Sequence, residues 1–132
     1  MKNLNNKNIL VGITGSVAAY KAAQLVSNLK KNGANVRVIM TKASTSFITE
    51  RTLESISNNQ VLVDESETEE SFLHLEVAKW ADIVLVAPCT ANSLNKITKG
   101  LGDDLLSTAC LAFRGKIFIA PAMNPDMWNN TI

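Results

Sequence analysis

Cysteine, histidine, proline and aromatic residues are scarce in this 132-residue chain, and the scarcity excludes several classes of protein. The two cysteines, Cys89 and Cys110, lack Cys-x-x-Cys spacing, and His74 is the only histidine, so we expect reduced thiols, no disulfide framework and no metal site. The formal net charge is +1 and no basic cluster exceeds Lys30 and Lys31, which argues against a nucleic-acid partner. Apolar runs such as residues 83–89 are far shorter than the roughly 20 residues of a membrane helix. With a polar N-terminus unlike a signal peptide, the sequence predicts a cytoplasmic protein without a membrane partner.

Apolar residues are plentiful, at 46% against 19% charged, which is enough for one core in a chain of single-domain length. Short β-branched runs predict strands at residues 9–14, 36–40, 61–63, 82–87 and 116–120. Helical spacing predicts helices at residues 18–29, 44–57 in one or two pieces, 73–79, and 90–112 with a break near Gly100 and Gly102. This alternation predicts an α/β fold, a three-layer α/β/α sandwich around a parallel sheet of Rossmann-like or flavodoxin-like type. We expect a flexible tail at residues 1–7 and a single domain at residues 8–132.

Polar residues follow the predicted strands at their carboxyl ends, where ligands bind in such folds. Gly15 and Ser16 come after the first strand, and a glycine there lets the backbone approach a phosphate. An ordinary turn with a serine cap explains the same residues. The spacing of Gly12 and Gly15 does not match the dinucleotide fingerprint, so we expect no NAD site.

Two further loops lie at the same edge of the predicted sheet. Residues 88–93 bring hydrogen-bonding side chains to the start of a helix, which suits a polar planar ligand as well as a helix cap. Residues 121–128 combine prolines, Met123, Met127 and Trp128, side chains that also fill cores and interfaces. His74 is the natural general base, although a lone histidine beside an acidic loop is more often a surface or capping residue. Asp103 and Asp104 are expected to cap a helix.

Taken together, these motifs resemble the homo-oligomeric flavin-containing cysteine decarboxylases over nearly the whole chain. The resemblance rests on four features of the sequence: residues 15–18 after the first strand, His74 ahead of the PASANT-like residues 90–93, residues 100–106, and the PxMNxxMW motif at residues 121–128. It implies a flavoprotein domain that binds FMN, the electron sink that a cysteinyl decarboxylation needs. The FMN-binding residues it implies are Gly15, Ser16, Val17, Thr41, Lys42, Ala43, Thr90, Ala91, Asn92, Ser93 and Ala122.

The resemblance further implies a carboxy-lyase: FMN-dependent decarboxylation of 4'-phosphopantothenoylcysteine to 4'-phosphopantetheine, a step of coenzyme A biosynthesis. His74 would be the catalytic base and Asn124 would bind the substrate carboxylate. The family domain continues past PxMNxxMW into a substrate flap with a proton-donor cysteine, and we expect residues 8–132 to lack that flap. Cys89 and Cys110 precede the motif, so neither takes over this role.

The family also forms homotrimers, in some members larger assemblies of trimers, with FMN between subunits. Met127 and Trp128 would then bury against a neighbour, unless Trp128 packs into its own core. Two other functions remain open, a non-catalytic flavin-binding or regulatory subunit and a peptidyl-cysteine decarboxylase of the same family. The PxMNxxMW motif argues against the flavin prenyltransferases of this fold.

Overall fold

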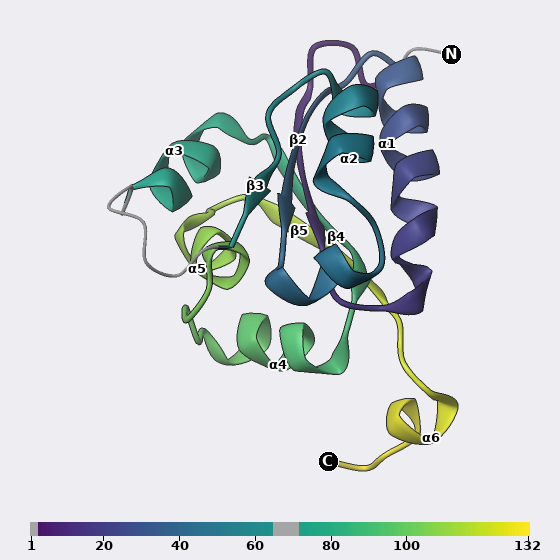
Figure 1. Ribbon diagram of the computed structural model, residues 1–132. Coiled ribbons are helices and arrows are strands. Elements are labelled where there is room, and N and C mark those ends of the chain that lie inside the picture. Colours follow the sequence, from purple (N-terminus) through teal and green to yellow (C-terminus); the bar gives the residue numbers. More distant parts are fainter. Residues whose placement is uncertain (1–2, 65–71) are drawn as a thin grey trace.

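A five-stranded, fully parallel sheet forms the centre of the protein in the computed structural model, which describes residues 3–64 and 72–132 (Figure 1). The strand order is β3-β2-β1-β4-β5. The strands are β1 (Asn8–Ile13), β2 (Asn35–Met40), β3 (Leu62–Val63), β4 (Ile83–Cys89) and β5 (Lys116–Pro121). The chain first builds outward from β1 through β2 to β3, and then returns to place β4 on the other side of β1. The predicted strands and their parallel arrangement are confirmed.

Helices cover both faces of this sheet because side chains of successive strand residues point to opposite sides. On one face, α1 (Tyr20–Lys31) and α2 (Glu50–Ser57) pack with Val11 of β1 in one apolar cluster. On the other, α3 (Leu73–Trp80), α4 (Ala91–Lys99) and α5 (Leu105–Ala112) pack with Leu10 in a second cluster. The result is the predicted three-layer α/β/α sandwich. Within the described ranges no helix has the length and apolar character needed to cross a membrane.

The layer formed by α1 and α2 does not extend over the edge strand β5. On the side of the sheet that α1 covers elsewhere, Phe118 is 52% exposed and the half-buried Leu85 lies beside it in the register. β4 lies between β1 and β5 and is an internal strand, as predicted. The strand buried most completely is β1.

Local signals fix most helix ends. Gly33 follows α1 with a φ of +94°, the left-handed conformation that favours glycine after a helix. The predicted break falls between α4 and α5, where Gly100 has a φ of +67° and Asp104 begins α5 with a capping box. The residues expected as a tail differ from that expectation. Residues 3–6 form a turn, the Leu4 N–H donates to the Asn32 carbonyl oxygen, and the Leu4 side chain packs on the core.

Short helical segments follow three of the strands. They are η1 (Val17–Ala19) after β1, η2 (Lys42–Ser46) after β2, and α6 (Pro125–Trp128) after β5. The sequence predicted helical structure at the first two positions but not α6. Asn124 caps α6 and Pro125 occupies its first turn, a start signal that the apolar residues around it concealed. α6 stands apart from the layers of the sandwich, close to the C-terminus (Figure 1).

Candidate functional site

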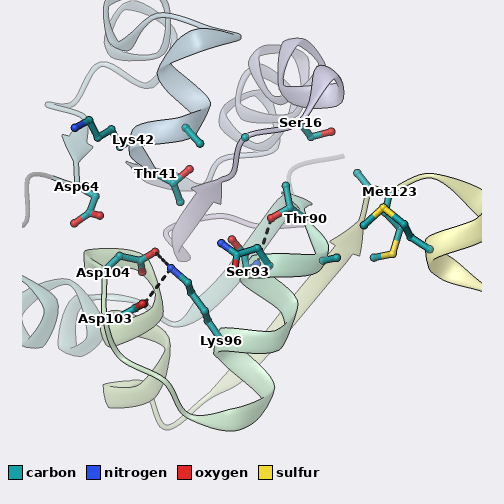
Figure 2. A pocket seen from close by; sticks show the side chains of 16 residues that line it. Ser16, Thr41, Lys42, Asp64, Thr90, Ser93, Lys96, Asp103, Asp104 and Met123 are labelled. Carbon is teal, nitrogen blue, oxygen red and sulfur yellow. Dashed lines mark hydrogen bonds and ion pairs between the residues drawn. The ribbon is translucent and has the colours of Figure 1, made fainter. Parts of the chain in front are cut away.

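A cavity of about 610 Å³ opens at the carboxyl ends of the strands, next to the neighbouring strands β1 and β4, from which the chain continues into helices on opposite faces of the sheet (Figure 2). This is the position at which open α/β sheets bind ligands, and the volume lies in the ordinary range for a small-molecule site. Loops after β1, β2, β4 and β5 line the cavity, so the sheet gathers segments that are far apart in the sequence. All of the FMN-binding residues that the family resemblance implied lie along it except Val17.

Three hydroxyl groups lie on these loops, and each caps the helical segment that follows its strand. Ser16 Oγ accepts from the Ala18 N–H at 3.1 Å, Thr41 Oγ1 from Ser44 at 3.3 Å, and Thr90 Oγ1 from Ser93 at 3.2 Å. A hydroxyl group that accepts through a lone pair still carries an O–H donor. The three hydroxyls, from three different strands, can therefore donate hydrogen bonds to an anionic or polar ligand in the cavity. The two readings of Ser16, cap and ligand contact, are thus compatible.

Gly15 is the point of closest approach between the loops after β1 and β2. A Cβ atom built on Gly15 would lie 2.6 Å from the Ala43 Cβ and 3.1 Å from the Ala43 carbonyl carbon. Contacts this short do not occur between real atoms, so any side chain at position 15 would push the two loops apart. The glycine thus sets the width of the cavity at this point.

Thr14 joins the ends of β1 and β4, a role that the sequence analysis missed. Its buried hydroxyl donates to the Pro88 carbonyl oxygen at 2.7 Å and accepts from the Thr90 N–H at 3.0 Å. The Ala87–Pro88 peptide bond next to it is cis. Both atoms that Thr14 binds belong to the backbone of residues 74 or more positions away, so no local pattern reveals the contact.

A group of charged side chains forms another wall of the cavity, at lower left in Figure 2. Lys96 Nζ lies 3.0 Å from Asp103 Oδ1 and 3.4 Å from Asp104 Oδ2. The hydrogen bond to Asp103 raises the pKa of Lys96, so the lysine is cationic. Asp104 Oδ1 accepts from Ser107 N–H as the cap of α5, and Asp64 Oδ1 accepts from the neighbouring Leu105 N–H at 3.1 Å. The cap at Asp104 was predicted, whereas Asp103 does not cap the helix as expected, and Lys96 was not predicted as a site residue.

The remaining candidate residues lie away from the cavity lining. The Val17 side chain is 77% exposed. Asn124 caps α6, its Oδ1 accepting from the Asp126 N–H at 2.7 Å, while Met123 and Met127 on either side of it do line the cavity. His74 is half-buried in the first turn of α3 and is not among the lining residues. A single chain therefore does not bring the candidate base to the candidate cofactor site.

Both cysteines are buried in the core and neither lines the cavity. Burial raises the pKa of the Cys89 thiol to about 11 and that of Cys110 to about 12. Thiols with such values stay protonated near neutral pH and are poor nucleophiles.

A parallel α/β sandwich whose hydroxyl-lined cavity lies at the carboxyl ends of its strands belongs to the class of proteins that bind nucleotides and flavins at this edge of the sheet. Residues 1–132 match the family described as Flavoprotein, and the chain belongs to this family. The chain is 47% identical over 132 residues to the coenzyme A biosynthesis bifunctional protein CoaBC of Haemophilus influenzae. The match covers 98% of this chain and 33% of that protein, so the chain spans about a third of the length of this relative.

Solved structures give the same fold. The chain superposes on the FMN-dependent cysteine decarboxylase SpaF with a TM-score of 0.87 and 28% identity, covering 97% of this chain and 75% of that one. It superposes on a cysteine-to-serine mutant of PPC decarboxylase, complexed with pantothenoylaminoethenethiol, with a TM-score of 0.78 and 34% identity. That match covers 96% of this chain and 72% of the decarboxylase chain. The family resemblance and the fold expected from the sequence are confirmed.

Proposed function

We propose that this chain binds FMN and catalyses the decarboxylation of 4'-phosphopantothenoylcysteine to 4'-phosphopantetheine, a step of coenzyme A biosynthesis. The observation that carries the proposal is the cavity at the carboxyl ends of β1 and β4, with Gly15 and the hydroxyls of Ser16, Thr41 and Thr90 around it. The similarity to a coenzyme A biosynthesis protein and to PPC decarboxylase supports this substrate.

The residues around the cavity fit FMN. Ser16, Thr41 and Thr90 offer O–H donors for a phosphate or a ribityl chain. Ala91, Ala122 and Met123 supply apolar surface for a flat ring system. Bound FMN would supply an acceptor for the electrons that a cysteinyl substrate releases.

Asn124 is suited to hold the substrate carboxylate. Its amide oxygen is occupied by the Asp126 N–H, which leaves the amide N–H groups as donors. Its neighbours Met123 and Met127 line the cavity, so a substrate bound against the flavin would lie near α6. The amide would fix the position of the carboxylate and keep it ionised until carbon dioxide leaves.

His74 is proposed as the base, and it would reach the cavity of a neighbouring subunit. Two observations support an assembly, for which we propose a homotrimer. His74 lies outside the cavity of its own chain, and Met127 and Trp128 are 54% and 61% exposed on a helix that stands apart from the sandwich. The alternative that Trp128 packs into its own core does not hold. A neighbouring chain that covers α6 would bury these side chains and complete the site.

Absorbance and product analysis test the function. The purified protein should bind FMN on titration, turn yellow, and release carbon dioxide from 4'-phosphopantothenoylcysteine. His74→Asn should abolish this release while the flavin spectrum remains. A protein that stays colourless with FMN contradicts the proposal, and one that binds FMN without turnover indicates a flavin-binding subunit that lacks catalysis on its own.

Mixing two inactive variants tests the shared site. If His74 and Asn124 of one site come from different subunits, co-assembly of His74→Asn with Asn124→Asp restores part of the activity, because some sites receive both native residues. Each variant alone remains inactive and serves as the control. No recovery in mixed assemblies, checked by light scattering, would place both residues in the same chain.

Peptidyl-cysteine decarboxylation is the second candidate, because the TM-score to the peptidyl-cysteine decarboxylase EpiD, 0.83, exceeds the 0.78 to PPC decarboxylase. Sequence identity points the other way, at 28% against 34%. Incubation with 4'-phosphopantothenoylcysteine and, separately, with a peptide that ends in cysteine distinguishes the two by product mass.

A further inference from the structure

The charged residues of the cavity pose a problem for an anionic ligand. Three carboxylates, from Asp64, Asp103 and Asp104, line the cavity together with two lysines, Lys42 and Lys96. FMN carries a phosphate with nearly two negative charges at neutral pH. The carboxylates oppose its binding, and the opposition is strongest where the wall is least hydrated.

Two of these carboxylates are held in place by the fold. Asp104 caps α5 through the Ser107 N–H, at 2.7 Å, and its side chain is only 13% exposed. Asp64 binds the Leu105 N–H in the same turn of α5. Neither carboxylate can turn to solvent without leaving a helix N–H group unpaired, so the negative charge is a fixed property of this wall.

Lys96, which lies on α4, offsets part of the negative charge of this wall. Its side chain is 18% exposed, and its ammonium group lies within 3.4 Å of both Asp103 and Asp104. An ammonium has three N–H donors, which is enough to bind both carboxylates at once. The four-carbon stem crosses from one helix to the start of the next, so the lysine also fixes the connection between them (Figure 2).

We infer that Lys96 is a positioning residue that offsets one of the two negative charges of Asp103 and Asp104 and thereby lets the cavity accept a phosphorylated flavin in preference to an uncharged one. This inference rests on the proposed binding of FMN. Lys96 acts through the two aspartates, whose unbalanced charge would otherwise repel the phosphate across the cavity. Riboflavin lacks the phosphate, so its affinity should depend little on Lys96.

The experiment compares FMN with riboflavin by fluorescence titration of the full chain. Lys96→Met should raise the Kd for FMN about tenfold and that for riboflavin by less than about threefold, since one removed charge acts mainly on the phosphate. Lys96→Arg keeps the charge and should bind FMN nearly as the wild type does. Lys99→Met is the matched control, because Lys99 lies on the same helix but is exposed and outside the cavity lining.

A second substitution separates charge from folding. In Lys96→Met/Asp103→Asn the charge of the wall returns to its wild-type value, and FMN affinity should recover. Asp103→Asn alone should bind FMN more tightly than the wild type, and it is a safe variant since Asp103 is half-exposed and caps no helix. Equal losses of affinity for FMN and riboflavin in Lys96→Met, or no gain in FMN affinity from Asp103→Asn, would overturn the inference about Lys96. Either result would leave the proposed function standing. A wild-type protein that binds neither flavin would overturn the proposed function and this inference with it.

Discussion

Gly15 lines the cavity where the loops after β1 and β2 come close together, and the contact with Ala43 leaves no room for a side chain at this position. Gly15→Ala should weaken FMN binding at least about tenfold and destabilise the fold by about 1–3 kcal/mol, because the new methyl group overlaps Ala43. Flavin titration and urea unfolding measure the two effects. Gly102→Ala is the control, since Gly102 is exposed, outside the cavity, and no atom lies closer than 3.2 Å to the new Cβ. Similar losses in both variants would show that the contact at Gly15 is not the cause.

Cys110 makes the stability of the fold depend on pH in the alkaline range. Burial, the main cause, raises the pKa of its thiol from 9.0 to about 12. The folded state then retains a proton that the unfolded state loses, so the contribution of the thiol to stability is complete below pH 9 and declines as the pH rises toward 12.

The measurement is the free energy of unfolding in urea between pH 8 and pH 10.5. Cys110→Ala should lower stability at every pH but reduce the slope of the decline above about pH 9, because one shifted group has been removed. Parallel curves for the wild type and the variant would contradict the assigned cause.

At the scale of elements, the join between β1 and β4 depends on one hydroxyl group. Thr14→Val keeps the shape of the side chain but leaves the buried Thr90 N–H without its acceptor. The expected loss is about 1–3 kcal/mol in urea unfolding, together with weaker flavin binding, because Thr90 shifts with the loop. Thr98→Val, at an exposed site on α4, should change stability by less than about 0.5 kcal/mol. A loss at Thr98 as large as that at Thr14 would count against the join.

The elements themselves were largely predictable because their signals are local. The sequences of β1 and β4 are continuous apolar runs, as expected for strands between two helical layers. Gly33 and Asp104 mark the end of one helix and the start of another by residue type alone. The wall around Lys96 was not predictable in the same way. Asp64 reaches α5 across 41 positions, a contact that only the packed sheet creates. For His74 the sequence supplied a chemical type, and no local pattern showed that the side chain lies outside the cavity of its own chain.

At the scale of the whole molecule, a ligand in this cavity should stabilise the folded state. FMN at about 100 times its Kd should stabilise the protein by about 2.7 kcal/mol, which raises the melting temperature by about 10 °C. Differential scanning fluorimetry over a series of FMN concentrations checks this. Adenosine monophosphate, which carries a phosphate but no flavin ring, is the control. A melting temperature independent of FMN, in a protein shown to bind it, would mean that the unfolded chain binds equally well.

The strand order has a consequence for biosynthesis. The loops that enclose the cavity range from Gly15, near the start of the chain, to Met127, near its end. While the ribosome is still extending the chain, β1 and β2 can pair, but the side of β1 that will receive β4 stays open. A flavin that met the nascent protein would find only one wall of its cavity. Capture of the cofactor therefore belongs to the moment after β5 and Met127 have emerged from the ribosome.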